Sequence, residues 1–309
     1  MSVKNFGRTG VDTSESVSRA SLGGLMSNSY RAADYEVLYE TISAAAVANS
    51  KIKFGCIGTT VCGRPIPVVT IGKNNNSRAV LYVGGLDGAD ILSPSILLRF
   101  ILDYTEQIET ERRLYNVNLG YLYENRTVHI IPMLNPDGYH IRRNGVDGEL
   151  LRERLISQNG SDDFSEWRFN ARGADLSDSF RENVNTEPER ETAALCNYIR
   201  YFDEIGMVIR LHADGDALRY SSGEKCPPRS RALGRLLARM IGCRLVGPEE
   251  ITAGGATGYG PADWFIDSFN KPAYDCGCDF PEIDKQQSGD TFRAYCAVRE
   301  ALVSAPLLI

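Results

Sequence analysis

Short apolar segments that alternate with segments of helical spacing constrain the fold of this chain more than any other feature. Three of them are AVLYVGG (residues 79–85), HIIPM (129–133) and MVIRL (207–211). Strands that are apolar on both faces are typical of parallel sheets with helices on each side. Their alternation with helical segments is typical of α/β proteins. We therefore expect an α/β fold in which a mixed, mostly parallel sheet is covered by helices on both faces.

The domain organisation follows from the absence of internal boundaries. The 309-residue chain contains no internal repeat and, after residue 35, no linker rich in Pro and Gly. An α/β fold of this length is often one domain. Residues 1–33 are rich in Ser and Gly and contain few apolar residues for a core. We expect a flexible N-terminal segment at 1–33 and a single domain at 34–309.

Composition excludes several classes of partner. The net charge is −6 and the pI is near 5.3, without a basic stripe, so we expect no nucleic-acid partner. No apolar stretch approaches the ~20 residues of a membrane span, and no signal-peptide pattern is present, so we expect a cytoplasmic protein without a membrane partner.

Eight cysteines without a CxxC pair predict reduced, buried thiols. Cys276 and Cys278 should share one buried face of a strand.

The periodicity of the sequence locates most of the secondary structure. A Ser at position 93, followed by Pro94, is a typical start for a helix, so we expect Ser93 to be the N-cap. Helices are expected at 34–49, 93–108, 188–202, 228–242 and 290–308, and strands within 51–72, 78–85, 126–139, 207–212 and 271–280. The NPDG sequence at 135–138 is expected to form a turn.

Polar residues gather where several of these strands end. Asp87 and Asp90 follow one strand, His212 ends another, and Asp275 lies near the end of a third. Carboxyl ends of strands in an open α/β sheet converge on one crevice. Two carboxylates and one imidazole could bind a divalent cation. From spacing alone, solvated turn carboxylates are the favoured interpretation, because acidic turns at strand ends are common.

A family resemblance extends from about residue 34 to the C-terminus. It is carried by IKFGCIGTTVCGRPIPVVTIG, AVLYVGG, IIPMLNPDGY, WRFNARGADL, EPERETAALCNYIRYF, IRLHADG and ADWFI. In order and spacing these segments resemble the zinc carboxypeptidase family. They are most similar to bacterial members that cleave γ-D-glutamyl bonds in peptidoglycan stem peptides. The resemblance implies the fold of that family and, where the site is intact, zinc-dependent peptidase activity.

The resemblance also implies that the metal site has changed. The family binds zinc through His-x-x-Glu and a later strand-end His, which correspond here to Asp87, Asp90 and His212. A site of this kind tolerates Mn²⁺ or Fe²⁺ better than zinc. The expected cofactor is therefore one divalent metal (zinc by family, with Mn²⁺ or Fe²⁺ as alternatives) or none. Asp137 matches the Asp that supports the first ligand in the family. It would face Asp87, and the two carboxylates would repel each other unless a cation or a proton lay between them.

The residues expected to act on a substrate have changed as well. Gly277 occupies the position of the general-base Glu of the family, and Asp275 or Asp279, on the same strand face, is a candidate replacement. Ser177 and Asp178 stand where the family binds the terminal carboxylate of its substrate, which Asp178 would repel. Arg172, in NARG, would polarise or position a substrate carbonyl. The alternative roles are solvated carboxylates and a structural arginine.

Two functions follow from these substitutions. One is a family member that has lost most peptidase activity and binds a peptide or small ligand in an acidic cleft, or an unknown protein partner. The other is an active metallopeptidase that hydrolyses peptide or γ-glutamyl amide bonds with an Asp/Asp/His metal site. A metal-dependent protein of different chemistry is a third hypothesis.

Overall fold

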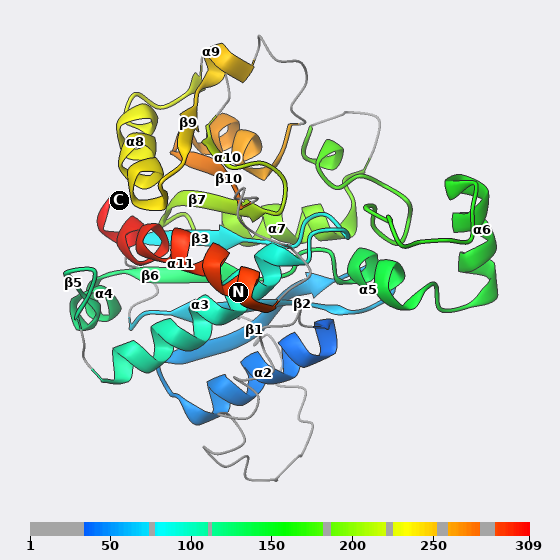
Figure 1. The fold of residues 1–309 in the computed structure, drawn as a ribbon, viewed down its shortest axis with the longest axis horizontal. Helices are drawn as coiled ribbons and strands as arrows, with labels where there is room; N and C mark the ends of the chain where they lie inside the picture. Colours follow the sequence, from blue (N-terminus) through cyan, green and yellow to red (C-terminus); the bar gives the residue numbers. More distant parts are fainter. Residues whose placement is uncertain are drawn as a thin grey trace, which may run out of the picture.

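The computed structural model describes residues 34–73, 78–110, 113–181, 187–220, 225–251, 259–278 and 288–309. The N-terminal segment 1–33, which we expect to be flexible, lies outside the described residues. The described part is built around one eight-stranded sheet (Figure 1). No described helix has the length and apolar character needed to cross a membrane.

The sheet has the strand order β1-β2-β6-β3-β7-β10-β8-β9. Its centre, β6, β3, β7 and β10, is parallel, whereas β1, β2 and β6 pair antiparallel and β8 runs antiparallel to β10. The strands are β1 (Ile52–Thr59), β2 (Pro65–Ile71), β3 (Ala79–Val83), β6 (Thr127–Ile131), β7 (Ile205–His212), β8 (Ala217–Arg219), β9 (Arg244–Val246) and β10 (Ala273–Gly277). A separate hairpin pairs β4 (Arg113–Leu114) with β5 (Val117–Asn118). The mixed, mostly parallel sheet predicted from the sequence is confirmed.

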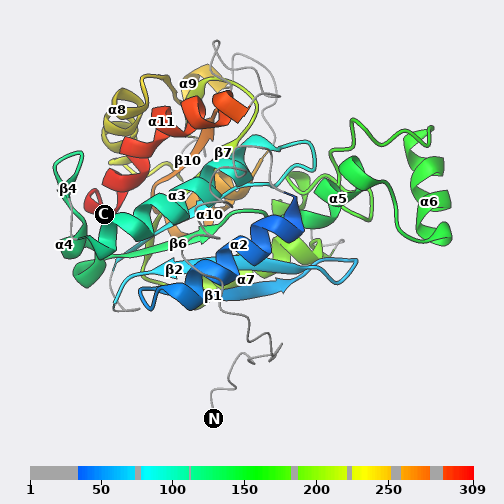
Figure 2. The same cartoon turned by 60° about the horizontal axis from the view of Figure 1, so that its bottom comes forward.

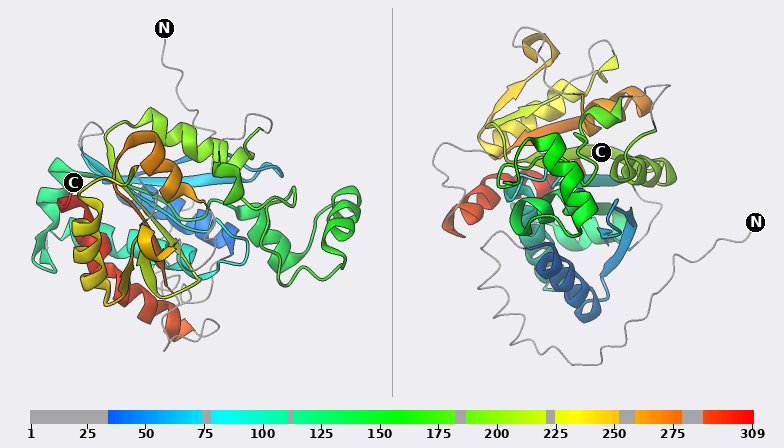
Figure 3. Two further views of the ribbon diagram at one scale, coloured as in Figure 1. Left: turned by 90° about the horizontal axis from the view of Figure 1, so that it is seen from above. Right: turned by 90° about the vertical axis from the view of Figure 1, so that its right-hand side faces the viewer.

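Helices cover both faces of the sheet, as predicted (Figure 3). One face packs against α2 (Tyr35–Ala48), α3 (Leu92–Glu109), α8 (Ser230–Ile241) and α11 (Ser288–Ser304), and the other against α7 (Arg190–Tyr201) and α10 (Pro261–Phe269). The shorter helices are α4 (Leu119–Asn125), α5 (Pro136–Asn144), α6 (Glu149–Asn159) and α9 (Pro248–Ile251). In Figure 2, α6 stands away from the sheet on the side of α5.

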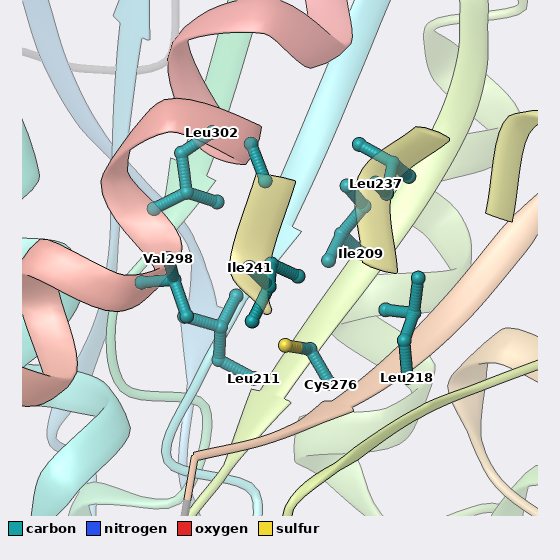
Figure 4. Close-up of a pocket in the computed structure, with 9 residues that line it drawn as sticks. Ile209, Leu211, Leu218, Leu237, Ile241, Cys276, Val298 and Leu302 are labelled. Carbon is teal, nitrogen blue, oxygen red and sulfur yellow. The ribbon is translucent and has the colours of Figure 1, made fainter. Parts of the chain in front are cut away.

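The core is apolar and closely packed. Cys276 and Cys278 are buried, as the sequence suggests. Of the eight cysteines, all free, three are exposed: Cys56, Cys62 and Cys296. A cavity of about 10 Å³ remains between β7, β8, β10, α8 and α11 (Figure 4). Its walls are apolar and it has room for at most one water molecule, so it is a packing void rather than a ligand site.

Two predictions about local structure, the start of one helix and a turn, are wrong. The helix expected to begin after Ser93 begins at Leu92, so Ser93 lies in its first turn. The NPDG sequence does not form a turn between strands; it starts α5, with Asn135 as N-cap and Pro136 in the first turn. The Asn135 side chain accepts a hydrogen bond from the N–H of Gly138. Asn and Pro are favoured at helix starts as well as in turns, so the local signal fits both.

His129 predicts how the stability of the core depends on pH. The ring is buried on β6, and its Nδ1 lies 2.7 Å from the Tyr198 hydroxyl. Burial lowers the pKa of His129 to about 4. The unfolded chain takes up this proton near pH 6.5, so stability is complete above that pH and is lost as the pH falls toward 4.

Relative to His129→Gln, we expect the wild-type chain to lose up to about 3 kcal/mol of unfolding free energy between pH 6.5 and pH 4. Urea denaturation at several pH values measures this difference. Parallel pH profiles of the two proteins would contradict the buried neutral imidazole.

Candidate functional site at the carboxyl ends of the sheet

The loop after β3 is fixed against the start of α5. Main-chain N–H groups of Leu134 and Asn135 donate to the carbonyls of Gly84 and Gly85, at 3.0 and 2.8 Å. Farther along, a Cβ on Gly88 would lie 2.7 Å from the main chain of Gly138, so the two segments touch where only glycine fits. This contact places Asp87 and Asp90 beside the NPDG segment.

Asp90 holds the start of α3. Its Oδ1 accepts from the backbone N–H groups of Leu92 and Ser93, at 3.2 and 3.0 Å, and its Oδ2 accepts from the Ser93 hydroxyl at 2.5 Å. Burial raises the pKa of Asp90 to about 6, against the opposing hydrogen bonds from Ser93. The Asp90 carboxylate therefore performs the capping role that was predicted for Ser93. Both of its oxygens accept hydrogen bonds.

Asp87 is paired with an arginine. Its Oδ2 accepts from Nε of Arg168 at 2.7 Å, and its Oδ1 accepts from the N–H of Ala89 at 2.7 Å. The same guanidinium donates to Asp214, two residues after His212, at 3.2 Å. The hydrogen bond that Arg168 donates to Asp87 raises the pKa of Arg168. The Arg168 side chain therefore bridges the loop after β3 and the loop after β7.

His212 ends β7 close to positive charge. Burial, with Arg210 and Arg219 as lesser causes, lowers the pKa of the imidazole to about 3, so the ring is neutral at physiological pH. A neutral imidazole can ligate a metal, but the two guanidinium groups that disfavour its protonation would also repel a dication. These strand ends carry both signs of charge rather than only the negative charge that the sequence suggested.

The position of the family's base is closed by main chain. Gly277 pairs with His212 across β10 and β7. A Cβ at Gly277 would lie 2.3 Å from the carbonyl oxygen of Gly215 and 2.6 Å from that of Asp214. The loop after β7 therefore occupies the space into which a longer side chain at 277 would extend.

Asp275, the candidate replacement base, faces two arginines. It lies opposite Arg210 on β7 and Arg219 on β8, and its Oδ1 is 3.5 Å from Nη1 of Arg210. Burial raises the pKa of Asp275 to about 6, with the charge of Arg210 acting in the opposite direction. The other candidate, Asp279, lies outside the described residues.

Asp137 has partners other than the expected Asp87. It is fully buried, accepts from Nη1 of Arg64 at 2.9 Å and from the N–H of Cys62 at 2.8 Å. The resemblance implies that Asp137 supports a metal ligand. In this structure Asp137 instead binds the β1–β2 turn. No sequence motif indicated this, because Arg64 lies 73 residues away.

The remaining predicted substrate residues lie near the surface. Arg172 is 60% exposed and its Nε is 3.7 Å from Glu189, which is the structural pairing considered from the sequence. The N–H of Ser177 donates to Asp175 at 2.8 Å, and Asp178 is exposed at the start of a 3-10 turn. None of these contacts joins Arg172, Ser177 or Asp178 to His212 or Asp275.

A larger pocket, of about 490 Å³, lies at the β1–β2 turn and α5. Its Asp147 carboxylate forms an ion pair with Arg64 at 3.2 Å and lies 2.9 Å from Nε2 of His140. With its charges neutralised internally, this pocket supplies no catalytic group to the strand ends.

The donors at Asp87, Asp90 and His212 do not fit a zinc ion as they are folded. The carboxylate oxygens accept hydrogen bonds from Ala89, Leu92, Ser93 and Arg168, which leaves few lone pairs for a metal. Within the described ranges, no three His, Cys, Asp or Glu side chains are grouped as a metal site requires. The assignment of these three residues to a metal stays a prediction.

Sequence reasoning missed the three arginines of this site. Arg168 follows Trp167 in the WRFNARG segment. A charged residue between two aromatic residues was the available signal. Arg210 interrupts the apolar run of β7, and a charge inside such a run indicates a partner. Arg219 has no comparable signal, because β8 is only three residues long.

Comparison with known proteins identifies relatives of this chain. The model of a family described as zinc carboxypeptidase matches residues 38–242, more than half of the chain. Gamma-D-glutamyl-L-diamino acid endopeptidase 1 of Lysinibacillus sphaericus is 27% identical over 264 residues, which are 78% of this chain and 64% of that protein. The chain thus spans slightly less than two thirds of the length of that relative.

Solved structures agree on the fold. A crystal structure of thrombin activatable fibrinolysis inhibitor superposes with a TM-score of 0.64 at 15% identity, covering 88% of this chain and 71% of that chain. The murein-tripeptide amidase of Escherichia coli O157 superposes with a TM-score of 0.50 at 18% identity, covering 81% and 91%. At these identities the likeness extends to the fold alone.

The closed space at Gly277 predicts a cost for the smallest side chain. We expect Gly277→Ala to lower the free energy of unfolding by about 1–3 kcal/mol, because the added methyl group must displace the main chain of Gly215. Urea denaturation gives the value. Gly55→Ala on β1 is the matched control, because its Cβ meets nothing nearer than 4.0 Å. Equal effects of the two substitutions would refute the close contact.

The capping role of Asp90 predicts a second effect on stability. We expect Asp90→Ala to destabilise the protein by about 1–2 kcal/mol, with a smaller loss for Asp90→Asn, which keeps an acceptor for the helix N–H groups. Thermal unfolding with EDTA and with added Zn²⁺ measures both variants. A loss that arises only when zinc is present would show a metal ligand instead of a cap.

Proposed function

This chain is a member of the zinc carboxypeptidase family, and from this premise we propose that it is a non-catalytic member that binds peptides at the carboxyl ends of its sheet. The single observation that carries the proposal is the main chain of Asp214 and Gly215 against Gly277. Amide hydrolysis requires a group that takes a proton from water and returns it to the leaving amine. At Gly277 there is neither such a group nor space for one.

The charges around His212 support the same proposal. Arg168 neutralises Asp87, and Asp90 caps α3, so two of the three candidate ligands have structural roles. Restoring a metal site would require breaking both sets of hydrogen bonds. The arginines instead make this part of the sheet suited to ligands with carboxylate groups, which guanidinium binds through paired hydrogen bonds.

The class of ligand is inferred from the relatives. The endopeptidase of Lysinibacillus sphaericus is named for its action on γ-D-glutamyl-L-diamino acid bonds. A protein that keeps the scaffold of such an enzyme while losing its catalytic groups can retain the recognition of its substrate. We therefore assign to this chain the binding of peptides that contain a γ-D-glutamyl-diamino acid unit.

An active peptidase is the second candidate, and one observation favours it. The pKa of Asp275, raised by burial to about 6, is in the range suited to a general base near neutral pH. In that function Asp275 would accept the proton of the attacking water. Asp275 is held opposite Arg210 and Arg219, however, and each of them stabilises its carboxylate.

Metal content and peptide binding test the proposal together. We expect the full chain, dialysed against Zn²⁺, Mn²⁺ or Fe²⁺, to retain no stoichiometric metal and to release no amino acid from γ-D-glutamyl-meso-diaminopimelic acid. Calorimetric titration with that dipeptide is expected to show saturable binding. Elemental analysis and chromatography of the reaction mixture supply the other two measurements.

Variants distinguish the outcomes. Stoichiometric metal that disappears in Asp87→Ala and His212→Ala, but not in the exposed control Glu109→Ala at the far end of α3, would overturn the non-catalytic assignment if hydrolysis accompanies it. Absence of both hydrolysis and peptide binding would overturn the ligand class.

A further inference from the structure

The outer face of α8 carries a row of basic side chains. Arg231, Arg235 and Arg239 follow one another at intervals of four residues, and all three are exposed. Residues at this spacing lie one above another on one side of a helix, so the row extends along about 12 Å of the helix axis. Arg229, at the cap position before the first turn, is exposed as well. In Figure 1, α8 lies at the edge of the molecule, beside β9.

The positive charge of this face is not balanced by neighbouring carboxylates. In the part of the chain that the structure describes, no acidic side chain pairs with Arg229, Arg235 or Arg239, whereas the nearby Arg244 pairs with Glu250 at 2.6 Å. Residues 225–244 contain six Lys and Arg and no Asp or Glu. Because the whole chain has a net charge of −6, the rest of it carries −12. The overall charge therefore hides a local basic surface.

The opposite face of α8 is committed to the core. Leu237 is fully buried, and the Tyr274 hydroxyl donates to the carbonyl of Ser230 at 2.7 Å. A Cβ on Gly234 would lie 2.8 Å from the side chain of Leu245, so the helix packs closely on the sheet. A helix that inserts into a bilayer needs a free apolar face, and α8 has none to offer. Its outer face is instead held in a fixed orientation and is available for a surface contact.

The composition of this outer face favours a partner with mobile negative charges. The exposed large apolar side chain of α8 is Leu236, which is 45% exposed and follows Arg235 directly. Protein interfaces derive most of their binding energy from clusters of aromatic and arginine anchors in desolvated pockets, and a convex helix face with one leucine provides no such cluster. Anionic lipids diffuse within the bilayer to the charges that they meet, so they need no matching register. Each arginine near such a surface increases the affinity about fivefold.

We propose that the outer face of α8 binds the surface of a membrane that contains anionic lipids, with Arg235 and Arg239 on the headgroup phosphates and Leu236 at the boundary with the acyl chains. The proposal is independent of the proposed function, because the residues at the strand ends do not belong to α8. The expectation of no membrane partner rests on the lack of an apolar span, which a surface contact does not require. The acidic remainder of the chain is repelled by the same lipids, so α8 is the side that faces the bilayer.

Cosedimentation with vesicles tests the proposal. We expect the full chain to pellet with phosphatidylcholine vesicles that contain one third phosphatidylglycerol at about 0.1 M salt, and not with pure phosphatidylcholine. Salt at about 1 M, where the Debye length falls from ~10 to ~3 Å, is expected to release the protein. The double variant Arg235→Glu/Arg239→Glu is expected to lose at least about tenfold in partition coefficient. Leu236→Gln is expected to weaken binding less and to leave its salt dependence unchanged.

A second double variant controls for the overall charge. Arg152→Glu/Arg190→Glu, at exposed positions of α6 and α7, changes the net charge by the same amount and is expected to bind like the wild-type chain. Equal losses in the two double variants would overturn the assignment to α8. Thermal unfolding establishes that each variant is folded. The milder Arg235→Gln/Arg239→Gln is expected to give an intermediate partition coefficient, and wild-type binding by it would contradict the proposal.

The remaining outcomes assign the row to other partners. Equal binding to both kinds of vesicle, or binding to neither, would overturn the proposal. If short duplex DNA or polyglutamate binds the wild-type chain and the vesicles do not, the row belongs to a nucleic acid or to an acidic protein. If the chain forms dimers in sedimentation velocity without vesicles, and Arg235→Glu/Arg239→Glu abolishes them while vesicle binding is absent, the row contacts a second copy.

Discussion

The contact between the loop after β7 and Gly277 determines the arrangement of the whole site. Because the carbonyl oxygens of Asp214 and Gly215 lie where a side chain at 277 would begin, the ends of β7 and β10 can close together only around glycine. The N–H of Cys278 then donates to the carbonyl of His212 at 2.9 Å, which continues the pairing of the two strands. The same loop carries Asp214 to Arg168 and so to Asp87. One close approach of main chain thus links three strand ends.

Most of the fold could be predicted from the sequence because its signals are local. The apolar runs at β3, β6 and β7 and the helical spacing of α2, α7 and α11 depend on residues near each other in the chain. The errors arose where one local signal fits two structures, as at NPDG, or where a neighbour competes, as when Asp90 rather than Ser93 caps α3. The short strands β8 and β9 escaped prediction because three residues carry little periodicity.

The site was less predictable because its partners are distant in sequence. The positions of Asp87, Asp90, His212 and Gly277 could be recognised from the family resemblance, but their present roles depend on side chains that arrive from other elements. Arg168 reaches Asp87 across 81 residues, and Arg64 reaches Asp137 across 73. A sequence motif shows which residue differs from the family pattern. It does not show which distant side chain pairs with that residue in the fold.

The substitutions are physically interdependent, which bears on how such a site evolves. A carboxylate at 87 without a metal is an uncompensated charge, and Arg168 and the N–H of Ala89 compensate it. Once the guanidinium is in place and the loop at 214–215 has closed on Gly277, a Glu at 277 meets main chain, and an added metal meets Arg168, Arg210 and Arg219. In this fold a Glu at 277 and a cation beside Asp87 would each conflict with neighbouring groups, so the roles of these positions are set together rather than one at a time.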